Sequence, residues 1–252
     1  NDNTEHNQQL WDTLINTHCP INHSVHHHYL TLNNSNSDLL LIQRFHQKIP
    51  HKQGVGLARK IGADIACQLI LNQQLNNSWF HHTDADTHLP DHYFSAIHTL
   101  PTQRKHTASA AVYPYTHICG SEHACYTATQ LYEKALQYYV DGLSLANSPY
   151  AYHTLGSCIA NNALYYAQAR GFPKKAGGED FYLLNKLAKL GEVITLENIE
   201  LKIDARHSAR VPFGTGPAVE KIMAMAAPDI EYEYYHPYCF QELKTLLSHF
   251  AF

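Results

Sequence analysis

The sequence predicts a single α/β domain, built on a mainly parallel sheet with helices on both faces. Strand-like apolar runs alternate along the chain with segments whose apolar residues recur at helical spacing, and this alternation is typical of parallel sheets. No internal repeat or low-complexity linker divides the 252 residues, a length that can bury a sizeable core.

The composition excludes several classes of protein. Apolar residues make up 44% of the chain, which argues against disorder, and no apolar run is long enough to span a membrane. The net charge of -4 and the scattered Lys and Arg residues argue against nucleic acid as a partner. The six cysteines include no Cys-x-x-Cys pair. We therefore expect reduced thiols and a cytoplasmic protein, either free or peripheral at the inner face of the membrane.

In the first half of the chain, apolar periodicity and turn residues predict the elements in order. We expect a helix around Leu10 to Ile15, a strand at 28–32, a polar turn at 33–38, a helix at 38–45, a loop at 49–56, a helix at 57–75, a strand at 79–82 and a helix at 93–100.

The same reasoning predicts the second half of the chain. We expect a strand of small residues at 107–115, helices at 130–145, 162–170 and 179–190, strands at 155–160 and 192–196, an irregular segment at 206–216, and a Tyr-rich tail from 217 that is helical in patches. Two His and two Cys residues cluster just before the helix at 130–145, at His117, Cys119, His123 and Cys125. Their spacing matches none of the usual zinc patterns, so we interpret them as a loop, with structural zinc as the alternative.

Two acidic residues, Asp84 and Asp86, follow the strand at 79–82. In extended geometry they would point the same way, and paired carboxylates at a strand end suit Mg²⁺ or Mn²⁺. The alternative is a solvated turn in which the Asp side chains bond to nearby backbone.

A second acidic pair, Glu179 and Asp180, follows the glycine-rich stretch 171–178 and opens a predicted helix. Glycine lets the backbone approach a ligand closely. The alternative is that the two acids only complement the dipole of the helix.

The order of these motifs resembles that of a family-2 glycosyltransferase of the GT-A fold. The matching segments are Asn1-Asp2, the stretch 33–38 (Asn-Asn-Ser-Asn-Ser-Asp), the stretch 56–62 (Gly-Leu-Ala-Arg-Lys-Ile-Gly), Asp84 and Asp86 with Pro90, and the stretch from Gly171 through Glu179 and Asp180 to Gly191. The resemblance implies a GT-A domain at 1–216, with the Tyr-rich extension 217–252 packed on the same domain.

The resemblance also implies an activity, which is transfer of a sugar from a nucleotide-diphosphate donor to an acceptor hydroxyl with inversion. Asp180 would be the general base, with Glu179 orienting or contacting the acceptor. A divalent cation, Mg²⁺ or Mn²⁺, would stabilise the leaving diphosphate. Asp86 would hold this ion with a neutral His207 as third ligand, and Asp84 would lie on the metal or near the ribose. The donor-binding residues implied are Asp2, Asn33, Asn34, Asp38, Arg59, Asp84, Arg206 and Arg210. The acceptor would be a glycan, a lipid or a small molecule.

Three departures from the family pattern bear on this interpretation. The hydrophobic first strand that normally precedes the Asn1-Asp2 position is not in the printed sequence, so we expect missing residues or a substitute segment. Asn33 and Asn34 stand where the family has two Asp residues, which weakens a preference for uridine. Lys60 replaces the usual Asn after Arg59.

Two other functions stay open at the level of sequence. A nucleotidyltransferase also pairs Asp residues on a metal, although the usual glycine-rich signature near the amino terminus is not visible here. A GT-A-like domain that binds nucleotide or glycan without turnover is the second alternative, and it is favoured by the missing strand and the Asn33-Asn34 change.

Overall fold

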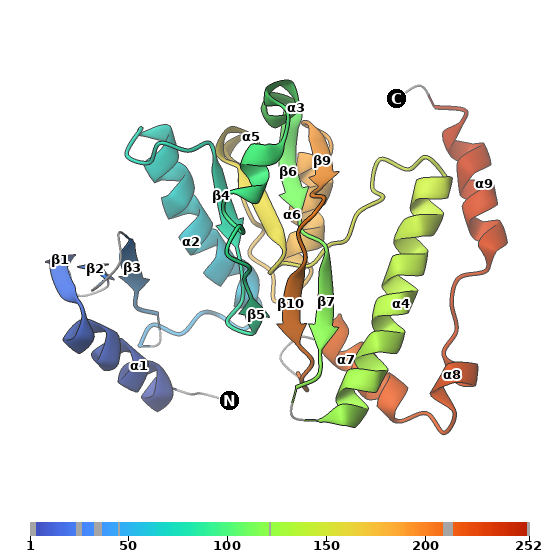
Figure 1. Cartoon of the computed structure of the whole chain (residues 1–252), viewed down its shortest axis with the longest axis horizontal. Coiled ribbons are helices and arrows are strands. Elements are labelled where there is room, and N and C mark those ends of the chain that lie inside the picture. The colour runs from blue at the N-terminus through green and yellow to red at the C-terminus, as the bar shows by residue number, and fades with distance from the viewer. Residues whose placement is uncertain are drawn as a thin grey trace. The chain divides into compact units, whose positions relative to one another are not determined.

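The computed structural model describes residues 4–23, 27–32, 37–44, 46–120, 122–208 and 214–250. The chain forms two compact units, Asn1–His51 and Lys52–Phe252. Figure 1 labels the elements of both units.

The first unit is a helix followed by an antiparallel sheet. Helix α1 (Thr4–Thr17) precedes strands β1 (Cys19–His23), β2 (His27–Thr31) and β3 (Asp38–Ile42), which pair in that order. The helix and the strand predicted around residues 10–15 and 28–32 are confirmed. The helix predicted at 38–45 is wrong, because the backbone of Asp38–Ile42 pairs with β2. A continuous apolar run has no periodicity that separates helix from strand.

The main sheet of the second unit has four strands in the order β4-β8-β6-β9. These strands are β4 (Trp79–His82), β8 (Ile159–Asn162), β6 (Ala108–Val112) and β9 (Glu192–Thr195). Strand β8 is antiparallel to both of its neighbours, whereas β6 and β9 are parallel. The α/β class is therefore confirmed, but the prediction of a mainly parallel sheet is wrong, because the main sheet is mixed and the sheet of the first unit is antiparallel.

A smaller sheet holds the segments that flank the predicted site. It has the order β5-β10-β7, with β5 at Thr87–His88, β10 at Leu201–Asp204 and β7 at Tyr115–Ile118. Strand β10, which periodicity did not indicate, runs parallel to β7 and antiparallel to β5. This pairing brings the chain just after Asp204 beside the chain just before Thr87.

Helices cover one face of the four-stranded sheet (Figure 1), and the other face packs against a 3₁₀ turn and strand β10. Helices α2 (Gly54–Leu71), α5 (Ala163–Gln168) and α6 (Glu179–Leu187) pack on Phe80, Ala110 and Ile159. The opposite face carries Trp79 and Ala111 and is covered by Tyr93 and the 3₁₀ turn Ala96–Thr99. A short helix, α3 (Thr102–Thr107), leads into β6. The helix predicted at 93–100 is thus only a short 3₁₀ turn.

The tail forms three helices beside the longest helix of the chain. Helix α4 (His123–Leu145) contacts α7 (Thr215–Met223) and α9 (Pro237–Leu247), and α8 (Pro228–Glu231) lies between these two in the sequence. The close approach of α9 requires glycine at position 142, because a Cβ there would lie 2.4 Å from the Phe240 ring. Within the described ranges, none of the helices combines the length and the apolar character needed to cross a membrane.

Candidate functional site

Asp84 and Asp86 lie in the connection between β4 and β5. Ala85 and Asp86 form a turn, which is closed by a hydrogen bond of 3.2 Å from the Thr87 amide to the Asp84 carbonyl. The Asp86 carbonyl accepts a hydrogen bond of 3.0 Å from the Asp204 amide, which fixes the turn to the end of β10. The pair is therefore not extended, and the two carboxylates contact different partners.

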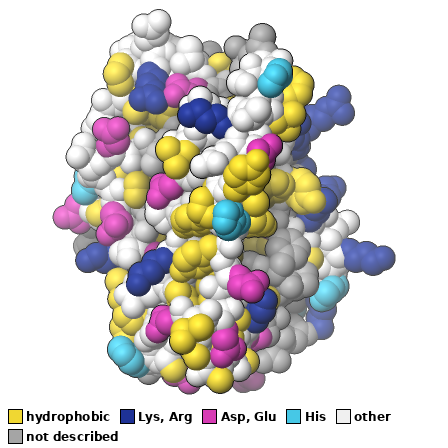
Figure 2. Space-filling model, turned by 90° about the vertical axis from the view of Figure 1, so that its right-hand side faces the viewer, with side chains coloured by type: hydrophobic (Ala, Val, Ile, Leu, Met, Phe, Trp, Pro, Cys, Tyr) yellow, Lys and Arg dark blue, Asp and Glu magenta, His cyan; other side chains and the backbone are white. Residues whose placement is uncertain are grey.

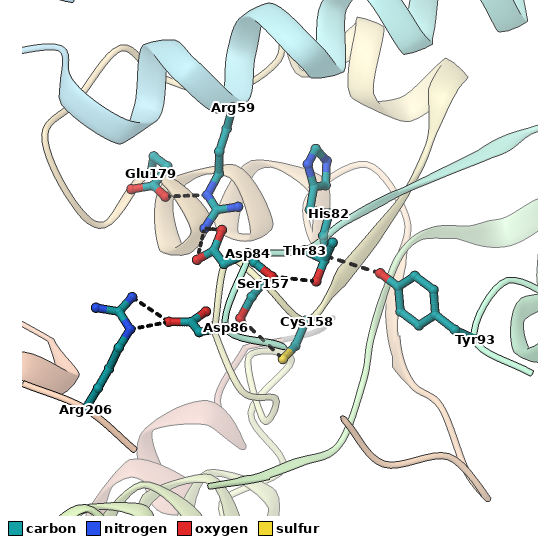
Figure 3. Close-up of polar contacts among 10 residues, drawn as sticks. All are labelled: Arg59, His82, Thr83, Asp84, Asp86, Tyr93, Ser157, Cys158, Glu179 and Arg206. Atoms are coloured by element: carbon teal, nitrogen blue, oxygen red, sulfur yellow. Dashed lines mark hydrogen bonds and ion pairs between the residues drawn. The ribbon is translucent and has the colours of Figure 1, made fainter. Parts of the chain in front are cut away.

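Arg59, on α2, joins the two predicted acidic pairs (Figure 3). Its Nε donates to Glu179 Oε1 at 2.9 Å, and its Nη2 lies 2.9 Å from Asp84 Oδ1 and 3.0 Å from Asp84 Oδ2. The Arg59 and Glu179 side chains are only 10% and 5% exposed, whereas that of Asp84 is 40% exposed. Burial lowers the pKa of Arg59, but the two carboxylates more than offset this effect and raise it. The guanidinium is therefore a fixed cation at the centre of the site.

Gly156 makes room for this guanidinium. A Cβ at position 156 would come within 2.7 to 2.9 Å of three Arg59 atoms. The sequence predicts a strand at 155–160, but residues 156–158 turn, and β8 begins at Ile159. A glycine within a strand pattern is the signal for such a close approach.

Glu179 and Asp180 open helix α6 directly after Gly178, whose φ of 67° is readily adopted by glycine. Asp180 Oδ1 accepts a hydrogen bond of 2.7 Å from the Phe181 amide. Burial and the neighbouring Glu179 charge raise the pKa of Asp180 to about 6, against the opposing effects of Arg59 and of backbone hydrogen bonds. The pKa of this carboxyl therefore lies closer to neutral pH than that of an ordinary aspartate.

Arg206 follows β10 and binds Asp86 (Figure 3). Its Nε donates to Asp86 Oδ2 at 2.7 Å, and its Nη2 contacts the same oxygen. The next residue, His207, turns to a different acid, and its Nε2 lies 2.7 Å from Glu122 Oε2. The structure therefore unites Arg206 with Asp86, and it does not bring His207 to the two aspartates.

The donor atoms of Asp84 and Asp86 are hard carboxylate oxygens, the type that Mg²⁺ and Mn²⁺ prefer. Each carboxylate, however, pairs with an arginine here. Across the described part of the chain, no three His, Cys, Asp or Glu side chains gather as a metal centre. Among the described residues, the two aspartates therefore offer donor atoms of the right type but not a complete set of protein ligands.

Several predicted donor-binding residues cannot be placed at this site. Asp2, Asn33, Asn34 and Arg210 lie outside the described residues. Asp38 belongs to the first unit, where its Oδ2 accepts a hydrogen bond of 2.8 Å from the Tyr29 hydroxyl.

Two residues near the site were not singled out in the sequence. His82 ends β4, packs edge-on against Phe172 at 4.9 Å, and has its pKa lowered to about 3 by burial and by nearby Arg59. Cys158 is buried, and burial raises the pKa of its thiol to about 12, which disfavours the thiolate at neutral pH. For His82, the only sequence signal of its packing against Phe172 is that a histidine stands within the predicted strand 79–82.

The sequence interpretation of the His and Cys cluster as a loop holds only for Cys119, which lies in the connection between β7 and α4. His117 lies in β7, where its amide donates to Glu133 Oε1 at 3.0 Å, and α4 already begins at His123. Cys125 is buried inside α4. The helix starts at His123, ahead of the predicted Gln130, so His117 lies on one element, and His123 and Cys125 lie on another.

No family model, curated protein or solved structure matches this chain.

Proposed function

We propose that this protein is a glycosyltransferase that moves a sugar from a nucleotide-diphosphate donor to an acceptor hydroxyl with inversion. One observation supports this most strongly. Arg59 binds Asp84 and Glu179, so the two acidic motifs, 95 residues apart in the sequence, meet at one place beside Asp180. Neither the turn interpretation of the first pair nor the helix-dipole interpretation of the second requires such a meeting.

In the proposed reaction, the acceptor oxygen attacks the anomeric carbon from the face opposite the diphosphate. The new carbon–oxygen bond forms as the bond to the phosphate oxygen breaks, and that electron pair leaves with the diphosphate. The acceptor proton passes to the Asp180 carboxylate. A pKa of about 6 suits this role, because the group is mostly ionised at neutral pH and still basic enough to accept a proton.

The leaving diphosphate gains negative charge, and the site offers positive charge to meet it. Arg206 is 42% exposed and can exchange Asp86 for a phosphate, since a guanidinium forms charge-assisted hydrogen bonds with both groups. Asp86 and Asp84 would hold the Mg²⁺ or Mn²⁺ that the resemblance implies. When bound, such an ion supplies Lewis-acid stabilisation of the phosphate charge.

Asp180→Asn tests the proposal, with Asp91→Asn at an exposed position as its matched control. Transfer from UDP-, GDP-, dTDP- and CDP-sugars is assayed first, and the free nucleotides are then tested by thermal shift with and without Mn²⁺. We expect Asp180→Asn to abolish transfer and to keep the nucleotide-induced shift of the wild type, because only the base is lost.

Turnover by Asp180→Asn close to that of the wild type would remove Asp180 from the role of base. The pairing of both aspartates with arginines favours one other function, a domain that binds nucleotide without turnover. A Mn²⁺-dependent thermal shift with no transfer by the wild type would establish that function instead.

A further inference from the structure

Helices α2 and α5 line a groove of about 350 Å³, a volume within the range of small-ligand sites. The α2 side is a stripe of residues at helical spacing, and the α5 side includes Tyr166, Ala167 and the turn at 170–171 that follows the helix. The described residues that line the groove include neither Arg59 nor Arg206, nor the acids that these arginines bind. The groove is therefore distinct from the candidate functional site. Figure 2 shows a different face of the second unit, over α4 and α9.

Three cations surround the turn that follows α5. Lys60 Nζ lies 3.4 Å from the Arg170 carbonyl oxygen, and Lys186 Nζ donates to the Ala169 and Gly171 carbonyls at 2.7 and 2.9 Å. The Arg170 side chain belongs to an exposed residue of the same turn. Burial lowers the pKa of Lys186, and the positive charges of Lys60 and Arg170 lower it further. The contacts and this repulsion place the three positive charges close together.

One carboxylate offsets part of this charge. Asp64 Oδ2 lies 2.9 Å from Lys60 Nζ, and Asp64 Oδ1 accepts a hydrogen bond of 2.9 Å from the Tyr166 hydroxyl. Asp64 is the one acid among the described residues that line the groove. Three positive charges and one negative charge leave a surplus of two positive charges. The Asp64 side chain is 47% exposed, so its ion pair with Lys60 contributes little and another anion can replace it.

Arg170 adopts a backbone conformation that few residues other than glycine adopt. Its φ is 62°, in the left-handed region, and Gly171 after it has a φ of 68°. Glycine or asparagine is the usual residue in this conformation just after a helix. An arginine at such a position carries a cost in stability, which indicates that its side chain has a use there.

The rest of the groove suits an uncharged polar group. Cys67 and Leu71 offer apolar surface, and the exposed amide of Gln68 lies about two helical turns beyond Lys60 on α2. An amide can donate hydrogen bonds to hydroxyl groups and accept hydrogen bonds from them. The groove therefore combines a cationic end with a neutral end that can bind hydroxyls.

We propose that this groove binds an organic phosphate monoester. The phosphate would lie between Lys60 and Arg170 and take the place of Asp64, and the hydroxyl-bearing part would extend along α2 toward Gln68. A phosphate monoester carries close to two negative charges at neutral pH, which match the surplus, whereas a simple carboxylate carries one. Ammonium and guanidinium groups both bind phosphate through charge-assisted hydrogen bonds. The proposal gives a role to Lys60, one of the departures from the family pattern, and it does not depend on the proposed transferase.

The test is calorimetric titration of the full chain with glucose 6-phosphate, ribose 5-phosphate and inorganic phosphate, with glucose as the uncharged control. We expect at least one ester to bind, glucose not to bind at the same concentration, and the affinity to fall as salt is added. Lys60→Gln and Arg170→Asn should each weaken ester binding by about tenfold or more, because each removes a charge-assisted hydrogen bond. Arg170→Asn should keep the fold, because asparagine tolerates the left-handed region.

Two control variants separate this groove from other cationic positions. Lys134→Gln removes an exposed lysine from helix α4, and Arg206→Gln removes the arginine that binds Asp86. Both variants should bind the ester as the wild type does.

The inference is overturned if neither ester binds, or if Lys60→Gln and Arg170→Asn both bind the ester as the wild type does. It is also overturned if Lys134→Gln or Arg206→Gln weakens binding as much as these variants do. Inorganic phosphate that binds as tightly as both esters would refute the choice of an ester, because the hydroxyl-bearing part would then contribute nothing.

Discussion

Arg59→Met removes the cation at the centre of the site and keeps a side chain of similar length. Glu179, 5% exposed, would then be a buried carboxylate without its ion-pair partner. Removing one member of a buried ion pair destabilises a protein by about 3 to 5 kcal/mol, because the remaining charge is left uncompensated. The contact to Asp84 adds at most about 1 kcal/mol, because Asp84 is 40% exposed and screened by water.

The chain offers a matched control for this change. Arg104 forms an ion pair with Glu192 at 2.7 Å, but these side chains are 50% and 45% exposed. Arg104→Met should cost less than about 1 kcal/mol. The double variant Arg59→Met/Glu179→Gln should recover much of the loss, because the amide of Gln carries no charge.

Urea unfolding measures these differences, with tryptophan fluorescence as the probe. Trp79 is buried in the main sheet of the second unit, and Trp11→Phe in every variant removes the signal of the first unit. The change in free energy of unfolding follows from the midpoint and the slope. If Arg59→Met costs no more than Arg104→Met, Glu179 is adequately solvated and the argument from burial is refuted.

Four further predictions concern pH, metal and packing. Transfer (kcat/KM) should rise with pH through about 6 and then level off, because Asp180 must lose its proton, and a rate that is flat from about pH 5 to 8 would contradict this. The free energy of unfolding should change with pH in the opposite direction. The raised pKa of Asp180 stabilises the folded state at acidic pH, and this stability is lost as pH rises through about 6. Urea titrations of Asp180→Asn at several pH values should lack this dependence. Asp86→Ala should abolish the Mn²⁺-dependent part of the nucleotide-induced thermal shift, and an unchanged Mn²⁺ titration would exclude it as a ligand. Gly142→Ala should lower the free energy of unfolding by about 1 to 3 kcal/mol and change the near-UV circular dichroism, because the new Cβ meets the Phe240 ring. Gly62→Ala is the control, because a Cβ at position 62 meets nothing within 4 Å, and this variant should be neutral or stabilising.

Much of the secondary structure could be predicted where one element has one clear periodicity. The helix at Glu179 and the strand at 79–82 both begin where predicted, since glycine or polar residues precede them. The segment Asp38–Ile42 could not be predicted, because four consecutive apolar residues fit helix and strand equally well and only the partner β2 decides.

The candidate site was predictable in its residue types and not in its contacts. The acids at 84, 86, 179 and 180 follow from motif order. The partners of Arg59 do not, because Asp84 lies 25 positions away and Glu179 lies 120 positions away, and no local rule connects such distances. The direction of Asp86 toward Arg206 depends on β10, a strand too short for its pattern to be recognised.

Strand β6 joins the two hydrophobic clusters of the second unit. Ala110 and Val112 belong to the cluster under the helices, and Ala108 and Ala111 belong to the cluster on the opposite face. Every side chain of this strand is buried, and four of its five residues are Ala or Ser, so only a thin layer separates the two clusters. A substitution that shifts the packing on either face displaces the same backbone, and we therefore expect the two clusters to unfold cooperatively. The amides of this strand should be among the last to exchange with deuterated water, because they open only when the whole unit unfolds.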